Sequence, residues 1–111
     1  MILKTLIKVY NKKWNTMNRS QKRYRARHIL LSDIEDAEYI LEQLESGKKF
    51  DDLAKEFSEC DSSQKGGSLG VFSSGEMLPE FERALFRMKE GDISRPIRTK
   101  YGLHIIEKLK V

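Results

Sequence analysis

The stretch from Gly66 to Phe86 places several large apolar side chains inside a glycine-rich segment. Glycines stand on both sides of a short apolar run, and Pro79 precedes apolar residues at helical spacing. Connecting loops are usually polar, so the wall of an apolar pocket accounts for this pattern better than a surface loop does. Burial in an ordinary core explains the same residues equally well. The large apolar residues concerned are Leu69, Phe72, Met77 and Phe81.

Hydrophobic periodicity along the rest of the chain predicts a few strands with local helices between them. The expected strands cover about 24–31, 68–72, 93–98 and 103–109. The expected helices run from Ser32 to Gly47, over 50–57, and from Pro79 to Met88. Few strands, intervening helices and a closing hairpin indicate an α+β fold on an antiparallel or mixed sheet.

The first of these helices has a recognisable start and a predicted buried face. Ser32 followed by Glu35 is a capping-box signature. The buried stripe is expected to consist of Ile34, Ala37, Leu41 and Leu44. Between Ser58 and Gly67 turn-forming residues predict at most one short helical turn. Pro96 cannot donate to a sheet ladder, so the strand over 93–98 is expected at an edge or with an irregular start.

Charge divides the chain into two unequal parts. Residues 1–27 carry nine basic side chains and no acid, whereas residues 28–111 carry twelve basic and 17 acidic ones, a net charge of −5. We therefore divide the chain into a basic extension, 1–23, and a domain, 24–111. An anionic surface, membrane or nucleic acid, is expected as a partner of the extension only, and no nucleic acid is expected for the domain.

The spacing of apolar and basic residues over 1–16 predicts an amphipathic helix at the start of the extension. Such a helix could lie in a membrane interface or a partner's groove, could pack on its own domain, or could stay disordered. Met17 could serve as an alternative translation start. Lys4 and Lys8 interrupt the apolar run that a signal peptide needs, and the lone Cys60 excludes an internal disulfide. We expect a single-domain, cytoplasmic monomer.

Few side chains could carry chemistry. His28 and His104 lie in the middle of predicted strands, and their rings can meet if those strands are neighbours. With Cys60 they allow three functions: a cysteine hydrolase, a metal site, or a polar floor beneath an apolar pocket. No close-spaced pair such as CxxC or HxxxH supports a metal site, so no metal is expected.

Four segments carry a family resemblance in matching order and spacing. They are ARHILL at 26–31, GKKFDDLAKEFSECDSSQKGGSLGVF at 47–72, GEMLPEFERALF at 75–86 and TKYGLHIIEKL at 99–109. The run from Arg25 to Lys110 resembles the parvulin family of peptidyl-prolyl cis/trans isomerases, in its PpiC-like branch. The resemblance implies a four-stranded antiparallel sheet surrounded by about four helices, and an isomerase of X–Pro bonds that assists protein folding without a cofactor.

The resemblance also assigns expected roles to individual residues. The catalytic positions are His28, Cys60, Thr99 and His104. The substrate-binding positions are Leu69, Met77, Phe81, Phe72 and Tyr101. Within the second set, Phe72 is expected behind the wall as much as in contact with substrate. Proline-containing polypeptides are the implied partners.

Substrate preference and mechanism follow from two further features. The first strand leads from Leu31 directly into an acidic helix, whereas the phospho-specific branch of the family has a long basic loop there. Unphosphorylated X–Pro substrates are therefore expected. An Asp in relatives at the position of Cys60 would be a poor nucleophile, so we expect non-covalent catalysis. A weakly catalytic peptide-binding chaperone is the alternative.

Overall fold

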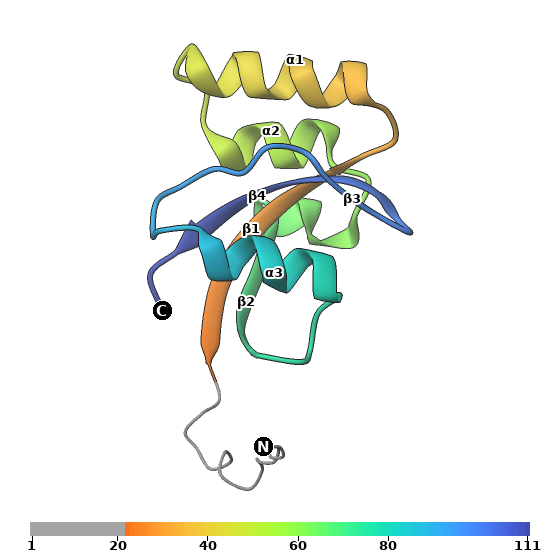
Figure 1. Cartoon of the computed structure of the whole chain (residues 1–111). Helices are drawn as coiled ribbons and strands as arrows, with labels where there is room; N and C mark the ends of the chain where they lie inside the picture. The colour runs from red at the N-terminus through yellow and green to blue at the C-terminus, as the bar shows by residue number, and fades with distance from the viewer. Residues whose placement is uncertain (1–21) are drawn as a thin grey trace, which may run out of the picture.

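The computed structural model describes residues 22–111, and the helix predicted over residues 1–16 lies outside the described residues. A four-stranded antiparallel sheet in the order β2-β1-β4-β3 forms the centre of the molecule (Figure 1). The strands are β1 (Arg23–Leu31), β2 (Ser68–Ser73), β3 (Ile97–Thr99) and β4 (Gly102–Leu109). The helices are α1 (Ile34–Glu45), α2 (Phe50–Phe57), the 3₁₀ helix η1 (Asp61–Lys65) and α3 (Pro79–Arg87). The predicted α+β fold with an antiparallel sheet is confirmed.

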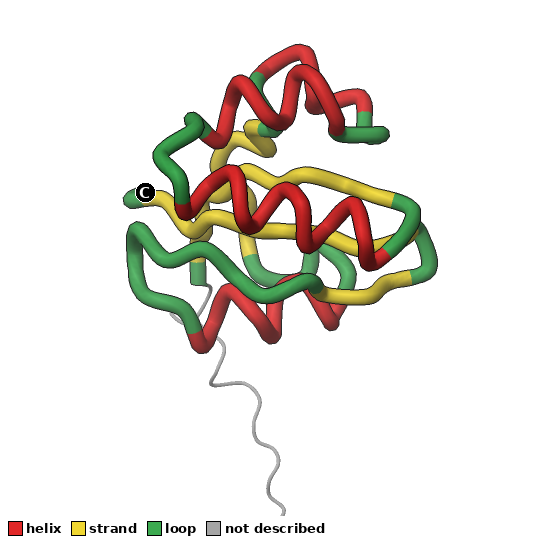
Figure 2. Tube along the Cα trace, turned by 90° about the horizontal axis from the view of Figure 1, so that it is seen from above, coloured by secondary structure: helices red, strands yellow, loops and turns green. Residues whose placement is uncertain are grey.

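The sheet separates two hydrophobic clusters, because alternate strand residues point to opposite faces. Ile29 of β1 and Ile105 of β4 pack with α1 and α2 on one face. Ala26 and Ile106, on the same two strands, pack with α3 on the other face. The helices accordingly lie on opposite sides of the sheet (Figures 1 and 2). Period-2 alternation in the sequence predicts that Ala26 shares a face with His28 and that Ile106 shares a face with His104, and this assignment is confirmed.

The first helix begins differently from its prediction. Asp33 is the N-cap residue, and its carboxylate accepts a hydrogen bond from the Asp36 amide at 2.9 Å. The Ser32 hydroxyl instead donates to the Glu59 carboxylate across a loop. The predicted capping box of Ser32 and Glu35 is therefore wrong, because a tertiary contact takes the serine away from the helix end.

The buried stripe of α1 is also shifted. Ala37 and Ile40 are fully buried, and Leu41 and Leu44 pack partly against them, whereas Ile34 is 48% exposed. At 100° per residue these four side chains define the packed face, and Ile34 lies at its margin. The prediction omitted Ile40 and wrongly included Ile34.

The strand predicted over 93–98 is mostly irregular. Only Ile97–Thr99 forms β3, at the edge of the sheet, and Ile93 makes an isolated bridge to Glu107. Pro96 interrupts the pairing between them, because it has no amide hydrogen to donate. The buried Ser94 hydroxyl accepts a hydrogen bond from the Ile106 amide at 3.0 Å and replaces a ladder bond. The irregular start is confirmed, but the predicted length is wrong.

The third helix is tied to the sheet at its C-terminal end. Pro79 occupies its first turn, as predicted. The Lys108 ammonium group of β4 donates to the carbonyls of Leu85 and Met88, at 2.9 and 2.8 Å. A cation at this end also interacts favourably with the helix dipole. These bonds fix α3, which forms one wall of the site described below.

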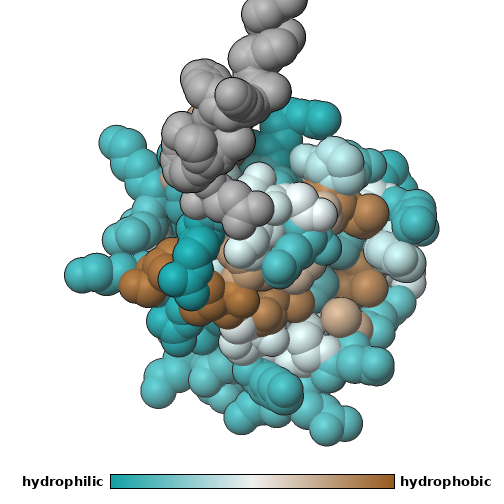
Figure 3. Space-filling model, turned by 90° about the horizontal axis from the view of Figure 1, so that it is seen from below, coloured by the Kyte–Doolittle hydropathy of each residue, from teal (hydrophilic) through white to brown (hydrophobic). Residues whose placement is uncertain are grey.

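Viewed from below, hydrophobic patches are bordered by hydrophilic side chains (Figure 3). Scattered exposed hydrophobic residues are common in soluble proteins, but Tyr101, 63% exposed, lines a hollow. Of the helices between residues 22 and 111, none has both the length and the hydrophobicity to cross a bilayer.

Candidate active site

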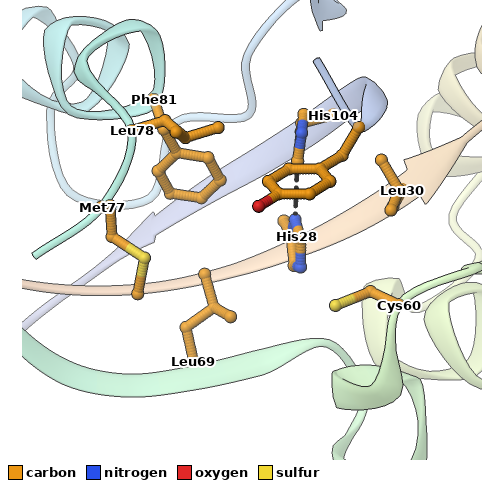
Figure 4. Close-up of a pocket in the computed structure, with 9 residues that line it drawn as sticks. His28, Leu30, Cys60, Leu69, Met77, Leu78, Phe81 and His104 are labelled. Atoms are coloured by element: carbon orange, nitrogen blue, oxygen red, sulfur yellow. Dashed lines mark hydrogen bonds between the residues drawn. The ribbon is translucent and has the colours of Figure 1, made fainter. Parts of the chain in front are cut away.

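A hollow of about 290 Å³ opens on the α3 side of the sheet (Figure 4). We call it the histidine hollow. Its walls are almost entirely aliphatic, aromatic or sulfur-containing, apart from two histidines at its floor. It is lined by His28, Leu30, Cys60, Leu69, Met77, Leu78, Phe81, Tyr101 and His104. Seven of these nine positions were predicted from the sequence as catalytic or substrate-binding.

The two histidines meet because their strands are neighbours. In the register of β1 and β4, Leu30 pairs with His104 and His28 pairs with Ile106, so the imidazoles are diagonal neighbours on one face. Their Nδ1 atoms lie 2.9 Å apart, and the rings stack with centroids 5.1 Å apart. One Nδ1 must carry a proton and the other a lone pair for this hydrogen bond to form. The predicted meeting of the rings is confirmed.

A hydrogen-bonded chain extends from this pair to the β3–β4 turn. The Thr99 Oγ1 lies 2.7 Å from the His104 Nε2 and also accepts a hydrogen bond from the Tyr101 amide. At the other end, the His28 Nε2 is buried and has no hydrogen-bond partner among residues 22–111. The hydrogen-bonded chain therefore ends in one buried nitrogen without a partner among these residues.

Burial keeps both imidazoles neutral. The pKa of His28 is lowered from 6.5 to about 4, first by burial and second by its proximity to His104. Burial also lowers the pKa of His104, and the Glu80 carboxylate partly opposes this effect. At neutral pH the floor is thus polar without carrying a net charge.

The segment carrying Cys60 is fixed to the end of β1. The Ser58 hydroxyl accepts hydrogen bonds from the Leu30 amide at 3.0 Å and the Cys60 amide at 3.4 Å. The Glu59 amide donates to the Leu30 carbonyl at 2.8 Å. These bonds place the half-buried free thiol of Cys60 at the edge of the hollow (Figure 4).

The apolar wall opposite Cys60 is formed by β2, α3 and the loop between them. Phe81 of α3 presents its edge to both imidazoles, with ring centroids 5.6 Å from each. The Glu82 carboxylate accepts hydrogen bonds from the amides of Gly75 and Met77, at 2.6 and 3.2 Å. This carboxylate fixes the loop that carries Met77, a role that no local sequence pattern indicates.

Gly67, the turn residue just before β2, holds the backbone of His28. Its carbonyl accepts a hydrogen bond from the His28 amide at 2.9 Å. Its φ is +85°, and a Cβ there would lie 2.3 Å from the His28 carbonyl oxygen. Glycine is required at this position because the two backbones approach closely and the conformation is left-handed.

Two predicted residues are not part of the lining. Phe72 lies behind the wall, where its ring packs against Phe81 with centroids 6.5 Å apart. Thr99 contacts His104 and does not border the hollow. Phe72 thus takes the position behind the wall, one of the two placements expected for it, and Thr99 lies beside the histidines as expected. The catalytic and substrate-binding roles of both residues stay predictions.

Two lining residues were not predicted. Leu30 shares the strand face of His28, so period-2 alternation could have identified it. Leu78 follows Met77 in the apolar stretch, and only packing distinguishes it from a core residue.

The alternative chemistries find little support in this geometry. Among residues 22–111, no group of three His, Cys, Asp or Glu side chains is arranged to hold a metal ion. No hydrogen bond joins the Cys60 sulfur to either imidazole in the same part of the chain, although a cysteine hydrolase needs such a base. The arrangement is instead an apolar hollow with a neutral, hydrogen-bonded pair of imidazoles at its floor.

Comparison with known proteins agrees with this geometry. The family model of the PPIC-type PPIASE domain, described as Rotamase, matches residues 16–110. The foldase protein PrsA of Bacillus subtilis is 48% identical over 85 residues, which are 76% of this chain and 29% of PrsA. The chain thus spans under a third of the length of this curated relative.

Solved structures show the same relationship. A crystal structure of the peptidylprolyl isomerase PrsA from Bacillus anthracis is 44% identical with a TM-score of 0.77, over 78% of this chain and 41% of that one. The solution structure of NmPin, the parvulin of Nitrosopumilus maritimus, is 42% identical with a TM-score of 0.73. That match covers 79% of this chain and 96% of NmPin.

Proposed function

This chain belongs to the PpiC-type family of peptidyl-prolyl cis/trans isomerases, the parvulins, and from this membership we propose that its histidine hollow accelerates rotation about X–Pro bonds of polypeptides. One observation carries the proposal: a neutral pair of imidazoles lies at the floor of an otherwise apolar hollow. The assignment of roles to individual residues is likewise our proposal.

The apolar wall addresses the main energetic barrier. Rotation about a peptide bond costs roughly 18–20 kcal/mol because the amide loses its resonance. The planar amide is more charge-separated than the twisted one, so a site without water favours the twisted state relative to water. Leu69, Met77 and Phe81 would hold the proline ring in this environment while the preceding carbonyl rotates.

The polar floor would add hydrogen bonds that fit the twisted state. His28 and His104 are neutral, so they stabilise a rotating amide without requiring the burial of a charge. The free thiol of Cys60, a half-buried residue that lines the hollow, would be one polar group available for this role. Thr99 would act indirectly, since it orients the His104 ring. No step requires a metal or a cofactor.

A test of this proposal places a charged side chain in the apolar wall of the histidine hollow. Met77→Glu should lower kcat/KM at least about tenfold on a short X–Pro peptide, which corresponds to about 1.4 kcal/mol of lost transition-state stabilisation. Tyr39→Glu is the matched control, because Tyr39 is exposed on α1 beyond the other face of the sheet. Equal activity of the two variants and the wild type would contradict a role for the histidine hollow.

We further propose that the substrates are unphosphorylated. Only Ser32 and Asp33 connect β1 to α1, and the first turn of α1 adds Glu35 and Asp36. A phosphate at this place would meet carboxylates and no arginine cluster. To test this preference, kcat/KM is compared between a peptide with serine before proline and the same peptide with phosphoserine. A large preference for the phosphopeptide would contradict it.

A peptide-binding chaperone with slow turnover is the second candidate. The observation that favours it is the relationship to foldases, of which this chain matches less than a third. Peptide binding without acceleration of X–Pro exchange would support this reading. The cytoplasmic location and the monomeric state stay predictions, and the second can be measured by sedimentation.

A further inference from the structure

A second hollow, of about 330 Å³, lies between α3 and the chain leading into β3. We call it the arginine hollow, because three exposed guanidinium groups border it: Arg83, Arg87 and Arg98. Glu80 is the one carboxylate among its lining residues, and the remaining lining is apolar. The hollow therefore carries a local excess of positive charge.

No ion pair among the described residues neutralises these guanidinium groups. Within residues 22–111, the single ion pair joins Arg27 to Glu107, and none of the three arginines pairs with a carboxylate. The three groups also lie in a part of the chain, 28–111, whose net charge is −5. Guanidinium groups bind carboxylates in a bidentate geometry that a flexible ammonium group does not match. An anionic partner thus fits this surface by charge and by geometry.

The arginine hollow is close to the proposed isomerase site. Glu80 borders the arginine hollow and the adjacent Phe81 borders the histidine hollow, so the two hollows flank one turn of α3. A helix with its side chains is about 10–12 Å across. An extended chain covers about 3.3–3.6 Å per residue, so about three to four residues bridge the two hollows.

We propose that the arginine hollow binds acidic residues of the same polypeptide whose X–Pro bond occupies the histidine hollow. The proposal rests on the proposed isomerase function and adds a preference to it: acidic side chains about three to four residues from the proline. The chemistry recognised is a carboxylate on an extended peptide.

The test compares X–Pro peptides that carry two glutamates at about three and four residues from the proline, on either side, with glutamine-matched peptides. Exchange is followed by NMR, which needs no coupling protease. At low ionic strength the wild type should favour one glutamate peptide by about threefold to tenfold in kcat/KM. At about 1 M salt this preference should disappear, because the Debye length falls to about 3 Å.

Two double variants test whether the preference for glutamate peptides depends on the arginine hollow. R83Q/R87Q removes two exposed charges of the arginine hollow and should abolish the preference while retaining turnover of the glutamine peptide. K48Q/K49Q removes two exposed charges before α2, beyond the other face of the sheet, and should retain the preference. Loss of the preference in both variants would reflect net charge alone and would overturn the proposal.

Further outcomes also decide the question. Equal kcat/KM for glutamate and glutamine peptides in the wild type overturns the proposal, as does a preference that survives R83Q/R87Q. Binding to anionic lipid vesicles that depends on Arg83 and Arg87, without any peptide preference, assigns the surface to a membrane instead. If neither peptide is turned over, the isomerase function fails. In that case the dissociation constants of the glutamate and glutamine peptides test the arginine hollow separately. Tighter binding of the glutamate peptide supports the proposal, and equal binding overturns it.

Discussion

Cys60 lies at the edge of the histidine hollow without a hydrogen bond between its sulfur and either imidazole. A nucleophile would need such a base, whereas a polar group that only tunes the field of the site does not. Its placement by Ser58 is backbone-mediated, so the side chain can change without moving the segment.

Replacement of Cys60 should therefore be tolerated. Cys60→Asp and Cys60→Ala should keep kcat/KM within about tenfold of the wild type, since one hydrogen bond is worth about 1 kcal/mol. The measurement is X–Pro exchange, with circular dichroism as the control for folding. Complete loss of activity in folded Cys60→Asp would favour a covalent mechanism.

His28 makes the stability of the domain depend on pH. Its pKa is about 4 in the folded state and near 6.5 when the chain unfolds, so the unfolded state binds the proton more readily. Stability is then complete above about pH 6.5 and decreases as the pH falls toward 4. The free energy of unfolding should be about 2 kcal/mol lower at about pH 5 than at about pH 7.5. His104, whose pKa is also lowered, acts in the same direction.

Urea unfolding at the two pH values measures this difference. His28→Gln is the control, because it removes the titrating group and should flatten the pH dependence whatever its own stability. If the free energy of unfolding of His28→Gln depends on pH as strongly as that of the wild type, other groups cause the dependence.

At the scale of the elements, α1 shows how a tertiary contact can override a local signal. Ser32 and Glu35 match the capping-box pattern, yet Asp33 caps the helix. Ser32 bonds Glu59, which precedes the Cys60 position, so this serine connects α1 to the site segment.

This assignment predicts different effects for two adjacent serine and aspartate positions. Asp33→Ala should lower the free energy of unfolding by about 1 kcal/mol, because a helix amide loses its cap. Ser32→Ala should change it by less than about 0.5 kcal/mol, since it removes one exposed hydrogen bond. Thermal and urea unfolding compare the two variants. A larger loss in Ser32→Ala would restore the capping box.

At the scale of the whole molecule, charge is divided unequally along the chain. Residues 1–27 hold nine basic groups without an acid, while the rest of the chain is net negative. The domain division at residues 23 and 24 stays a prediction, although β1 begins at Arg23 and the family match begins at residue 16. Any attraction to an anionic surface through net charge should therefore depend on the basic extension.

A chain starting at Met17 tests this at the whole-molecule scale. It lacks Lys4, Lys8, Lys12 and Lys13, so its net charge falls from +4 to 0. Binding to anionic vesicles at low salt should weaken at least about tenfold, at about 1 kcal/mol for each basic residue near the surface. Vesicle sedimentation measures the difference. Equal binding of the two chains would exclude a role for the first sixteen residues.

Local sequence patterns determined the fold class, both faces of β1 and β4, and the extent of α2 and α3. These features depend on the geometry of one strand or one helix. The spacing of apolar residues in the sequence indicates that geometry directly. The family resemblance added expected roles for residues that are distant in the sequence. Periodicity and composition alone had left three functions open.

Only the tertiary structure decided how those residues interact. His28 and His104 are separated by 76 positions, and their hydrogen bond exists because β1 and β4 pair in one register. The support of Met77 by Glu82 depends on the fold in the same way, as does the exclusion of Phe72 from the lining. Hydrophobic periodicity indicates which face of a strand or helix a side chain occupies. The contacts of that side chain depend on the elements that pack against the face.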